Sequence, residues 1–257
     1  MALHNRPSRV RITSKTKSLR VQPTSKDELK FLIKEELESQ GPDADLNFID
    51  TSLITDMSHL FSFPLDYPYV NVGNIKIDEW DTSKVTDMSY MFVDCPSLHC
   101  DPSRWNVSGV TNMECMFGGC RELDCDLSNW NVSNVVDISK MFKDCYRFRG
   151  TGLSEWNVQS LQKMESAFKH CHILNCNLSG WEFSNPVDMF YAFDGCYSFP
   201  DGYKPQQVHR AINSTQSIQT TINNLVSLQN NTMSRYNNNS VLVMNEKMYK
   251  EFKDYLD

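Results

Sequence analysis

Five tryptophans recur along this chain at a nearly constant interval, and this repeat constrains the fold more than any other feature of the sequence. They are Trp80, Trp105, Trp130, Trp156 and Trp181, spaced 25, 25, 26 and 25 residues apart. Two further residue types keep the same phase, namely Cys95, Cys120, Cys145, Cys171 and Cys196, and Phe92, Phe117, Phe142, Phe168 and Phe193. The chain is therefore a repeat protein, and each motif must be judged by its position in the repeat.

Each repeat unit, or coil, contains two different apolar patterns. The first spaces its apolar residues at i, i+3, i+4 and i+7, which predicts a helix of about two turns. In one coil these residues are Met113, Met116, Phe117 and Cys120. The second pattern alternates apolar and polar residues, as in Leu123, Cys125 and Leu127, and predicts a short strand with one buried face. One strand and one short helix per coil is the leucine-rich-repeat layout.

The chain divides into four predicted parts. They are a basic arm (1–23), a capping helix (24–44), the repeat (45–203) and a helical and strand extension (204–257). Ser25 and Glu28 form a capping box that starts the capping helix. We therefore predict an α/β fold, a right-handed leucine-rich-repeat-like solenoid of about six strand-plus-short-helix coils, with an N-terminal capping helix and a C-terminal helical extension.

Charge is unevenly distributed along the sequence. The whole chain carries a net charge of −7, and the arm at residues 1–23 holds six basic residues and no acidic one, so the remainder carries −13. An acidic body disfavours nucleic acid as the main ligand. We expect the arm to be a solvated tail, and contact with an acidic partner is the alternative.

Cysteine usage and the absence of long apolar runs indicate the compartment. No segment has the apolar core of a signal peptide or the length of a membrane span. The nine cysteines, an odd number, indicate free thiols in a reducing environment. The Asn-x-Ser tripeptides at Asn106, Asn131 and Asn177 then indicate turns rather than glycosylation. We expect a cytoplasmic or virion-associated protein that is not secreted through a signal peptide.

Two candidate sites contain cysteine, and both fall on repeat positions. Cys145 resembles a nucleophile, but cysteine occurs once per coil at the end of the helical stripe, which favours core packing. The residues His170, Cys171, His172 and Cys176 are of types that bind zinc. Both of these cysteines occupy repeat positions, however, and the C-x-x-C spacing is missing, so we predict no metal.

A third candidate is an oxygen-rich column, a column being one equivalent position in successive coils. It contains Asp56, Asp87, Asn112, Asp137 and Asp188. Calcium binding is one interpretation, but Lys163 interrupts the column. An acid at the start of each predicted helix would stabilise that helix by interacting favourably with its dipole, and we prefer that interpretation.

The outward side of the predicted strands, with one adjoining column, varies from coil to coil, whereas the inward columns keep their residue type. In solenoids this side is the usual binding surface, and a merely solvated surface is the alternative. We call this set the variable face: Asn74, Lys76, His99, Asp101, Glu122, Asp124, Asp126, Arg147, Arg149, Asn175 and Asn177. Its mixture of acids, bases and amides suits a protein or peptide partner.

The units VTNMECMFGGCRELDCDLSNWNVSNV and LQKMESAFKHCHILNCNLSGWEF resemble the BspA-like leucine-rich-repeat proteins, in the branch with W-x-V-S-x-V-T-x-M-x-x-M-F repeats. That branch occurs in bacterial surface proteins, mycoplasma lipoproteins and phage-associated genes. The resemblance covers residues 45–200 and implies a non-enzymatic binding or adhesion module, without implying a ligand. This sequence departs from the surface members because it shows neither a signal peptide nor a lipidation cysteine.

We therefore predict a protein–protein interaction module with no catalytic residue, cofactor or metal, acting on an unidentified protein partner. The alternative is a structural component of a phage virion or similar particle. In that role the chain would form a homo-oligomer through its C-terminal region, residues 204–257.

Overall fold

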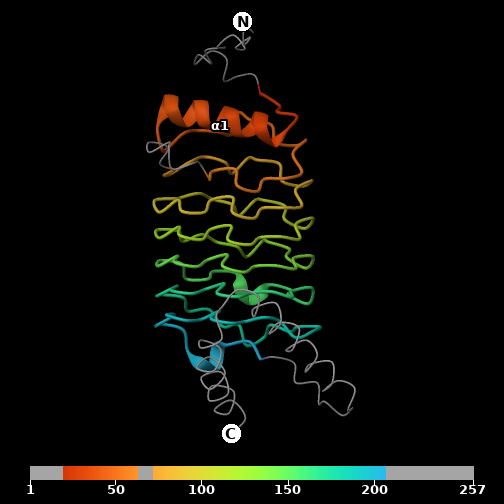
Figure 1. The fold of residues 1–257 in the computed structure, drawn as a ribbon, viewed down its shortest axis with the longest axis vertical. Coiled ribbons are helices and arrows are strands. Elements are labelled where there is room, and N and C mark those ends of the chain that lie inside the picture. The colour runs from red at the N-terminus through yellow and green to blue at the C-terminus, as the bar shows by residue number, and fades with distance from the viewer. Residues whose placement is uncertain (1–19, 63–71, 207–257) are drawn as a thin grey trace, which may run out of the picture. The chain divides into compact units, whose positions relative to one another are not determined.

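The computed structural model describes residues 20–62 and 72–206. The chain divides into two compact units, Met1–Val208 and His209–Asp257, and all described residues belong to the first. Most of the predicted arm (1–23) and nearly all of the predicted extension (204–257) therefore lie outside the described residues. Within the first unit, the chain forms layers that follow one another from helix α1 (Lys26–Gln40) onward (Figure 1).

The predicted capping helix is present as α1. Ser25 is its N-cap, and its hydroxyl oxygen accepts the N–H of Glu28 at 3.2 Å. The carboxylate of Glu28 accepts the N–H of Thr24 at 2.8 Å, one residue before the position that a capping box would use. The helix ends at Gly41, whose positive φ of 84° suits glycine.

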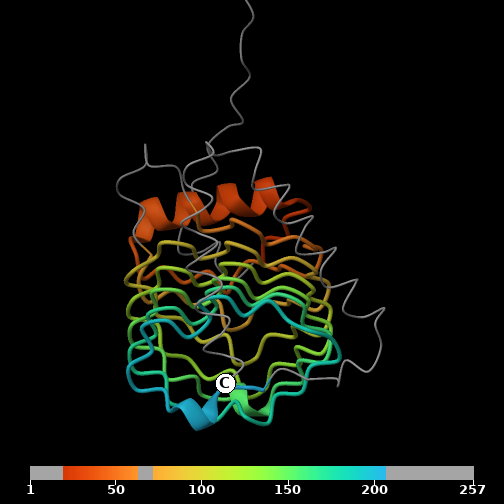
Figure 2. The ribbon, with the colours of Figure 1, turned by 60° about the horizontal axis from the view of Figure 1, so that its bottom comes forward.

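Helix α1 lies across the first coil (Figure 2). Its inner side contributes the buried side chains Leu29, Ile33 and Leu37 to the core. On the same side, the ammonium group of Lys26 lies 2.6 Å from a carboxylate oxygen of Asp56. The ammonium group of Lys30 donates to the carbonyls of His59 at 2.7 Å and Ser62 at 2.9 Å. Apolar burial and these cationic contacts together close this end of the stack.

The predicted α/β leucine-rich-repeat-like solenoid of strand-plus-short-helix coils is wrong. In the described ranges α1 is the only α-helix, and the coils contain just two short 3-10 helices, η2 (Leu153–Glu155) and η3 (Asp201–Tyr203). In the same ranges, the β pairing between coils consists of isolated parallel bridges rather than a sheet. The longest row of bridges joins, in order, Asp56, Asp87, Asn112, Asp137, Lys163 and Asp188.

Left-handed residues inside each apolar stripe prevent the predicted helix. One column has φ between 54° and 58°: His59, Tyr90, Cys115, Lys140, Ser166 and Tyr191. A second column four residues later also has positive φ: Asp94, Gly119, Asp144, His170 and Gly195. A right-handed helix cannot continue through a residue in this conformation. The stripe therefore folds as a succession of turns.

These turns direct alternate N–H groups toward the next coil. In one coil the donors are Met88, Tyr90, Phe92 and Asp94, and the acceptors are the carbonyls of Asn112, Glu114, Met116 and Gly118, at 2.8–3.0 Å. Within the coil, Cys95 N–H bonds to the Phe92 carbonyl at 3.1 Å, an i to i+3 turn bond. The four residues of the predicted stripe in the next coil are all buried, so the burial pattern was right although the hydrogen bonding was not.

The predicted strand segments keep their alternation but lack a ladder. Leu123, Cys125 and Leu127 are buried, while Asp124 and Asp126 are exposed. Backbone bonds to neighbouring coils are sparse here, as in the single bond from Leu127 N–H to the Thr151 carbonyl at 3.1 Å. An extended segment with so few inter-coil bonds does not count as part of a sheet.

Stacked side chains fill the inside of the coils. Successive phenylalanines from Phe61 to Phe193 have ring centroids 4.8–5.7 Å apart, and Trp156 stacks on Trp181 at 6.2 Å. Each of the five indole N–H groups donates to a carbonyl of the preceding coil, as Trp130 does to Pro102 at 2.9 Å. The rings thus stabilise the stack both by apolar burial and by satisfying carbonyls at the corners.

The cysteine column adds a second set of such contacts. Cys120, Cys145, Cys171 and Cys196 direct their thiols at the carbonyl of the phenylalanine one coil earlier, at 2.9–3.1 Å. Cysteine suits this column because it is a small apolar residue with a weak donor.

We predict that Gly152→Ala destabilises the fold, because Gly152 has a φ of 90° and an added Cβ would lie 2.2 Å from the backbone nitrogen of Ser128. The expected loss is about 2 kcal/mol or more in the free energy of unfolding, measured by chemical denaturation. Gly180→Ala is the matched control, because a Cβ there meets nothing within 4 Å. Equal stability of the two variants would contradict the close approach at Gly152.

Candidate protein-binding face

All eleven residues of the variable face are exposed. They come from the extended segment of each coil and from the turn that precedes it, where the alternation of buried and exposed residues turns them outward. The structure therefore brings them to one side of successive coils, although the sheet that was to carry them is absent. Their role in binding stays a prediction.

Each lysine and arginine of the variable face pairs with an acid of the preceding coil. Arg147 lies 2.8 Å from Glu122, Arg149 is in contact with Asp124, and Lys76 lies 4.0 Å from Asp45. Exposed pairs of this kind contribute no more than about 1 kcal/mol each to stability. Their effect on the surface is larger, since they leave it mixed and nearly neutral rather than a patch of one sign.

Three residues of the variable face also shape turns. Asp101, Asp126 and Asn177 occupy one column, and each side-chain oxygen accepts the N–H of the serine two residues later at 2.9–3.0 Å. The hydrogen bonds from Ser128 also hold the pKa of Asp126 below its ordinary value. These three side chains are therefore part of the architecture, whatever else they contact.

The sequence interpretation missed a neighbouring column of stacked side chains, which we call the surface ladder. The guanidinium of Arg121 lies 5.8 Å from the ring centroid of Tyr146. Tyr146 stacks on His172 at 4.7 Å, and His172 stacks on Tyr197 at 5.1 Å. Each of these residues directly follows a column cysteine, and the column changes type from coil to coil. The criterion that selected the variable face would therefore have found it.

The structure places the candidate nucleophile in the core. Cys145 is fully buried, and its thiol lies 3.0 Å from the Phe117 carbonyl. Burial raises the pKa of this thiol well above its ordinary value. A nucleophilic cysteine needs the opposite shift and solvent access.

The four candidate zinc ligands do not converge. The Cys171 thiol is directed at the Phe142 carbonyl at 3.0 Å, and His170 bonds to Asp144 at 2.6 Å. His172 is part of the surface ladder. Over residues 20–62 and 72–206, no group of three or more His, Cys, Asp or Glu side chains is arranged to hold a metal ion.

The oxygen-rich column has a structural role that differs from the predicted one. Its helix-dipole interpretation is wrong because no helix starts there. Instead, each of the five aspartate and asparagine side chains in this column accepts the N–H of the residue two positions later, at 2.8–3.1 Å. The Asn-x-Ser tripeptides make the same contact, and at Asn106 and Asn131 the distances are 3.1 and 3.2 Å, so the predicted turns are confirmed.

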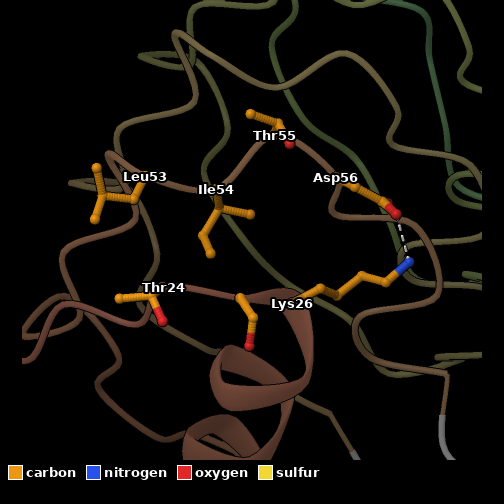
Figure 3. A pocket seen from close by; sticks show the side chains of 7 residues that line it. Thr24, Lys26, Leu53, Ile54, Thr55 and Asp56 are labelled. Atoms are coloured by element: carbon orange, nitrogen blue, oxygen red, sulfur yellow. Dashed lines mark hydrogen bonds and ion pairs between the residues drawn. The ribbon is translucent and has the colours of Figure 1, made fainter.

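A shallow pocket of about 80 Å³ lies between the start of α1 and the first coil (Figure 3). Thr24, Leu53 and Thr55 line it, and the ion pair between Lys26 and Asp56 crosses one side. Sites for small organic ligands usually enclose about 300–1,000 Å³, so this pocket is too small for one.

None of the helices in the described ranges is long and apolar enough to cross a membrane.

Comparison with protein families gives one match to this chain. The family model described as Mycoplasma protein of unknown function, DUF285, matches residues 33–152 and again residues 125–224. The matched residues include the second half of α1 and all the described coils. Comparisons with curated proteins and with solved structures give no match.

We predict that the folded protein loses stability as the pH rises above about 9. Burial raises the pKa of Cys120, Cys145 and Cys171 in the folded state, so these thiols stay protonated while the unfolded chain releases its protons. Their contribution is fully present below the unfolded-state pKa and falls as the pH rises, by up to about 2 kcal/mol per buried thiol at about pH 10.

Chemical denaturation at a series of pH values measures how steeply the free energy of unfolding falls with rising pH. Cys145→Ala should make this fall less steep by the contribution of one thiol, whatever the absolute stability of the variant. An unchanged slope would show that Cys145 is not a buried, protonated thiol.

Proposed function

We propose that this chain, which belongs to the family described as Mycoplasma protein of unknown function, DUF285, is a non-enzymatic module that binds a protein partner through its variable face. The observation that carries the proposal is the contrast between the two sides of each coil. Inward columns repeat the same residue types and are buried, whereas the variable face is exposed and changes from coil to coil. A stack of similar coils that differ on one exposed side is typical of repeat proteins that bind other proteins.

The chemistry of the variable face supports a protein rather than a polyanion as the partner. Acids and bases occur together and pair across coils, as Glu122 does with Arg147, and the amide of Asn175 follows in the next coil. A surface that binds nucleic acid would instead carry a continuous excess of basic side chains. Mixed polar groups fix register and specificity in protein interfaces.

We further propose that the chain is BspA-like in the finer sense. In NWNVSNVVDISKMF, the tryptophan, two valines, the first serine, the methionine and the phenylalanine stand at motif positions of that branch. In this structure Trp130 and Phe142 are buried in their stacks, and Asn131 bonds to the N–H of Ser133. The motif is thus a set of packing and turn residues, and binding or adhesion is left to the positions between them.

The alternative role in a phage virion or similar particle stays a prediction. It depends on oligomerisation through residues 204–257, of which only 204–206 are described. The expected cytoplasmic or virion-associated location likewise stays a prediction.

A triple variant tests the binding face: Asp124→Ala, Arg149→Ala and Asn175→Ala. It removes both partners of one ion pair, so no charge is left unpaired, and it spares Asp126, which holds a turn. We expect recovery of the partner from an extract of the source cells, quantified by mass spectrometry, to fall by about tenfold or more. Thermal melting should be nearly unchanged because all three residues are exposed.

The matched control carries Gln162→Ala, Glu182→Ala and Asn185→Ala, which are also exposed but lie outside the variable face. This control should capture the same proteins as the unmodified chain. If the triple variant of the variable face also captures them at full recovery, the face is not the binding surface.

A further inference from the structure

We propose that the surface ladder, Arg121, Tyr146, His172 and Tyr197, is the energetic centre of the partner-binding surface and takes an acidic segment of the partner. This inference rests on the proposed function and deepens it, because it names the kind of partner that binds. Arg121 and Tyr146 directly precede Glu122 and Arg147 in the chain, so the ladder is continuous with the variable face.

The first argument is the degree of order on an exposed surface. Tyr146 and His172 are nearly parallel, with an interplanar angle of 5°, and Tyr197 continues the stack although it is 82% exposed. Stacking restricts the rotamers of these side chains before any partner arrives, so less conformational entropy is lost on binding. Tyrosine and arginine are also the residue types that dominate binding energy in protein interfaces.

The second argument is the direction in which the rings face. Because the rings stack upon one another along the coils, their faces cover each other and their edges point outward. The edge of an aromatic ring carries the positive part of its quadrupole. The polar tips on these edges are the phenol O–H of tyrosine and the ring nitrogens of histidine, which can donate hydrogen bonds. An edge-on ladder therefore favours carboxylates over apolar or cationic groups.

The third argument concerns the charges beside the ladder. The acids close to it in the chain are paired with cations: Glu122 with Arg147 at 2.8 Å, Asp144 with Lys143 at 3.7 Å and Asp194 with Lys169 at 2.8 Å. Each of these carboxylates therefore already has a cation beside it. The guanidinium of Arg121, by contrast, lies over the Tyr146 ring and keeps its N–H donors for a carboxylate. Arg121 thus gives the ladder one cation on a body whose residues beyond the arm carry −13.

A short fluorescent oligoglutamate peptide is the probe, and anisotropy titration of the full chain at low salt is the measurement. An oligolysine peptide of the same length is the charge-reversed control. We expect the chain to bind oligoglutamate and not oligolysine. Arg121→Ala, His172→Ala and Tyr197→Ala should each weaken binding by about tenfold. Tyr197→Phe keeps the stacked ring, so its affinity for oligoglutamate should fall much less than that of Tyr197→Ala.

Two variants control for bulk charge and for exposed aromatic surface. Arg104→Ala removes an exposed cation outside the ladder, and Phe190→Ala removes a ring that is 57% exposed in the same coil as Tyr197. Both should bind oligoglutamate as the unmodified chain does. Equal losses in Arg104→Ala and Arg121→Ala would overturn the proposal, because net charge alone would then explain binding.

The results separate this inference from the proposed function. If a partner is captured through the variable face but the chain does not bind oligoglutamate, the ladder is not an acid-binding centre and the proposed function stands. If no partner depends on the variable face, the proposed function fails, whatever the peptide does.

Discussion

The hydrogen bonds from alternate N–H groups of one coil to the carbonyls of the next are the interaction on which the rest of this structure depends. They form because residues with left-handed backbone conformation, such as Tyr90 and Asp94, recur four positions apart in each apolar stripe and turn the chain. A helix would have used these N–H groups within the coil and left the layers joined only by side chains. By turning them outward, the chain joins successive coils through the backbone, and the coil-to-coil spacing then allows the phenylalanine rings to stack at 4.8–5.7 Å.

Small polar side chains stabilise this turn-rich backbone by accepting hydrogen bonds from its N–H groups. Aspartate and asparagine recur at the turns, where each accepts the N–H two residues later, as Asp137 does from Ser139 and Asp126 from Ser128. Indoles and thiols satisfy carbonyls of the preceding coil from inside, as Trp181 and Cys196 do. Most residues that look chemically active in the sequence are thus occupied in holding the backbone, which leaves recognition to the few columns that vary.

Much of this arrangement could be predicted from the sequence. The period, the buried columns, the indole hydrogen bond of Trp130 and the turns at Asn-x-Ser all follow from residue type and spacing. The conformation of the stripe could not be predicted in the same way. Residues at i, i+3, i+4 and i+7 are buried together on a helix, and they are also buried together in linked turns, so Met113, Met116 and Phe117 fit both. Non-glycine residues such as Lys140 and Ser166 at left-handed positions give no warning of the difference.

The candidate site divides in the same manner. The exposure of Asp124 and Asn175 follows from simple alternation, whereas the stacking of Tyr146 on His172 requires knowing that the column after the cysteines lies on the surface in register.

The inter-coil hydrogen bonds of the apolar stripe all run in one direction, and this has a consequence for how such chains change length over evolutionary time. In this stripe each donor lies in the earlier coil and each acceptor in the later one, from Met57 and Asp87 through Met164 and Asp188. A duplicated interior unit would therefore find a donor edge before it and an acceptor edge after it, so gene duplication can lengthen the stack without redesigning its terminal helix.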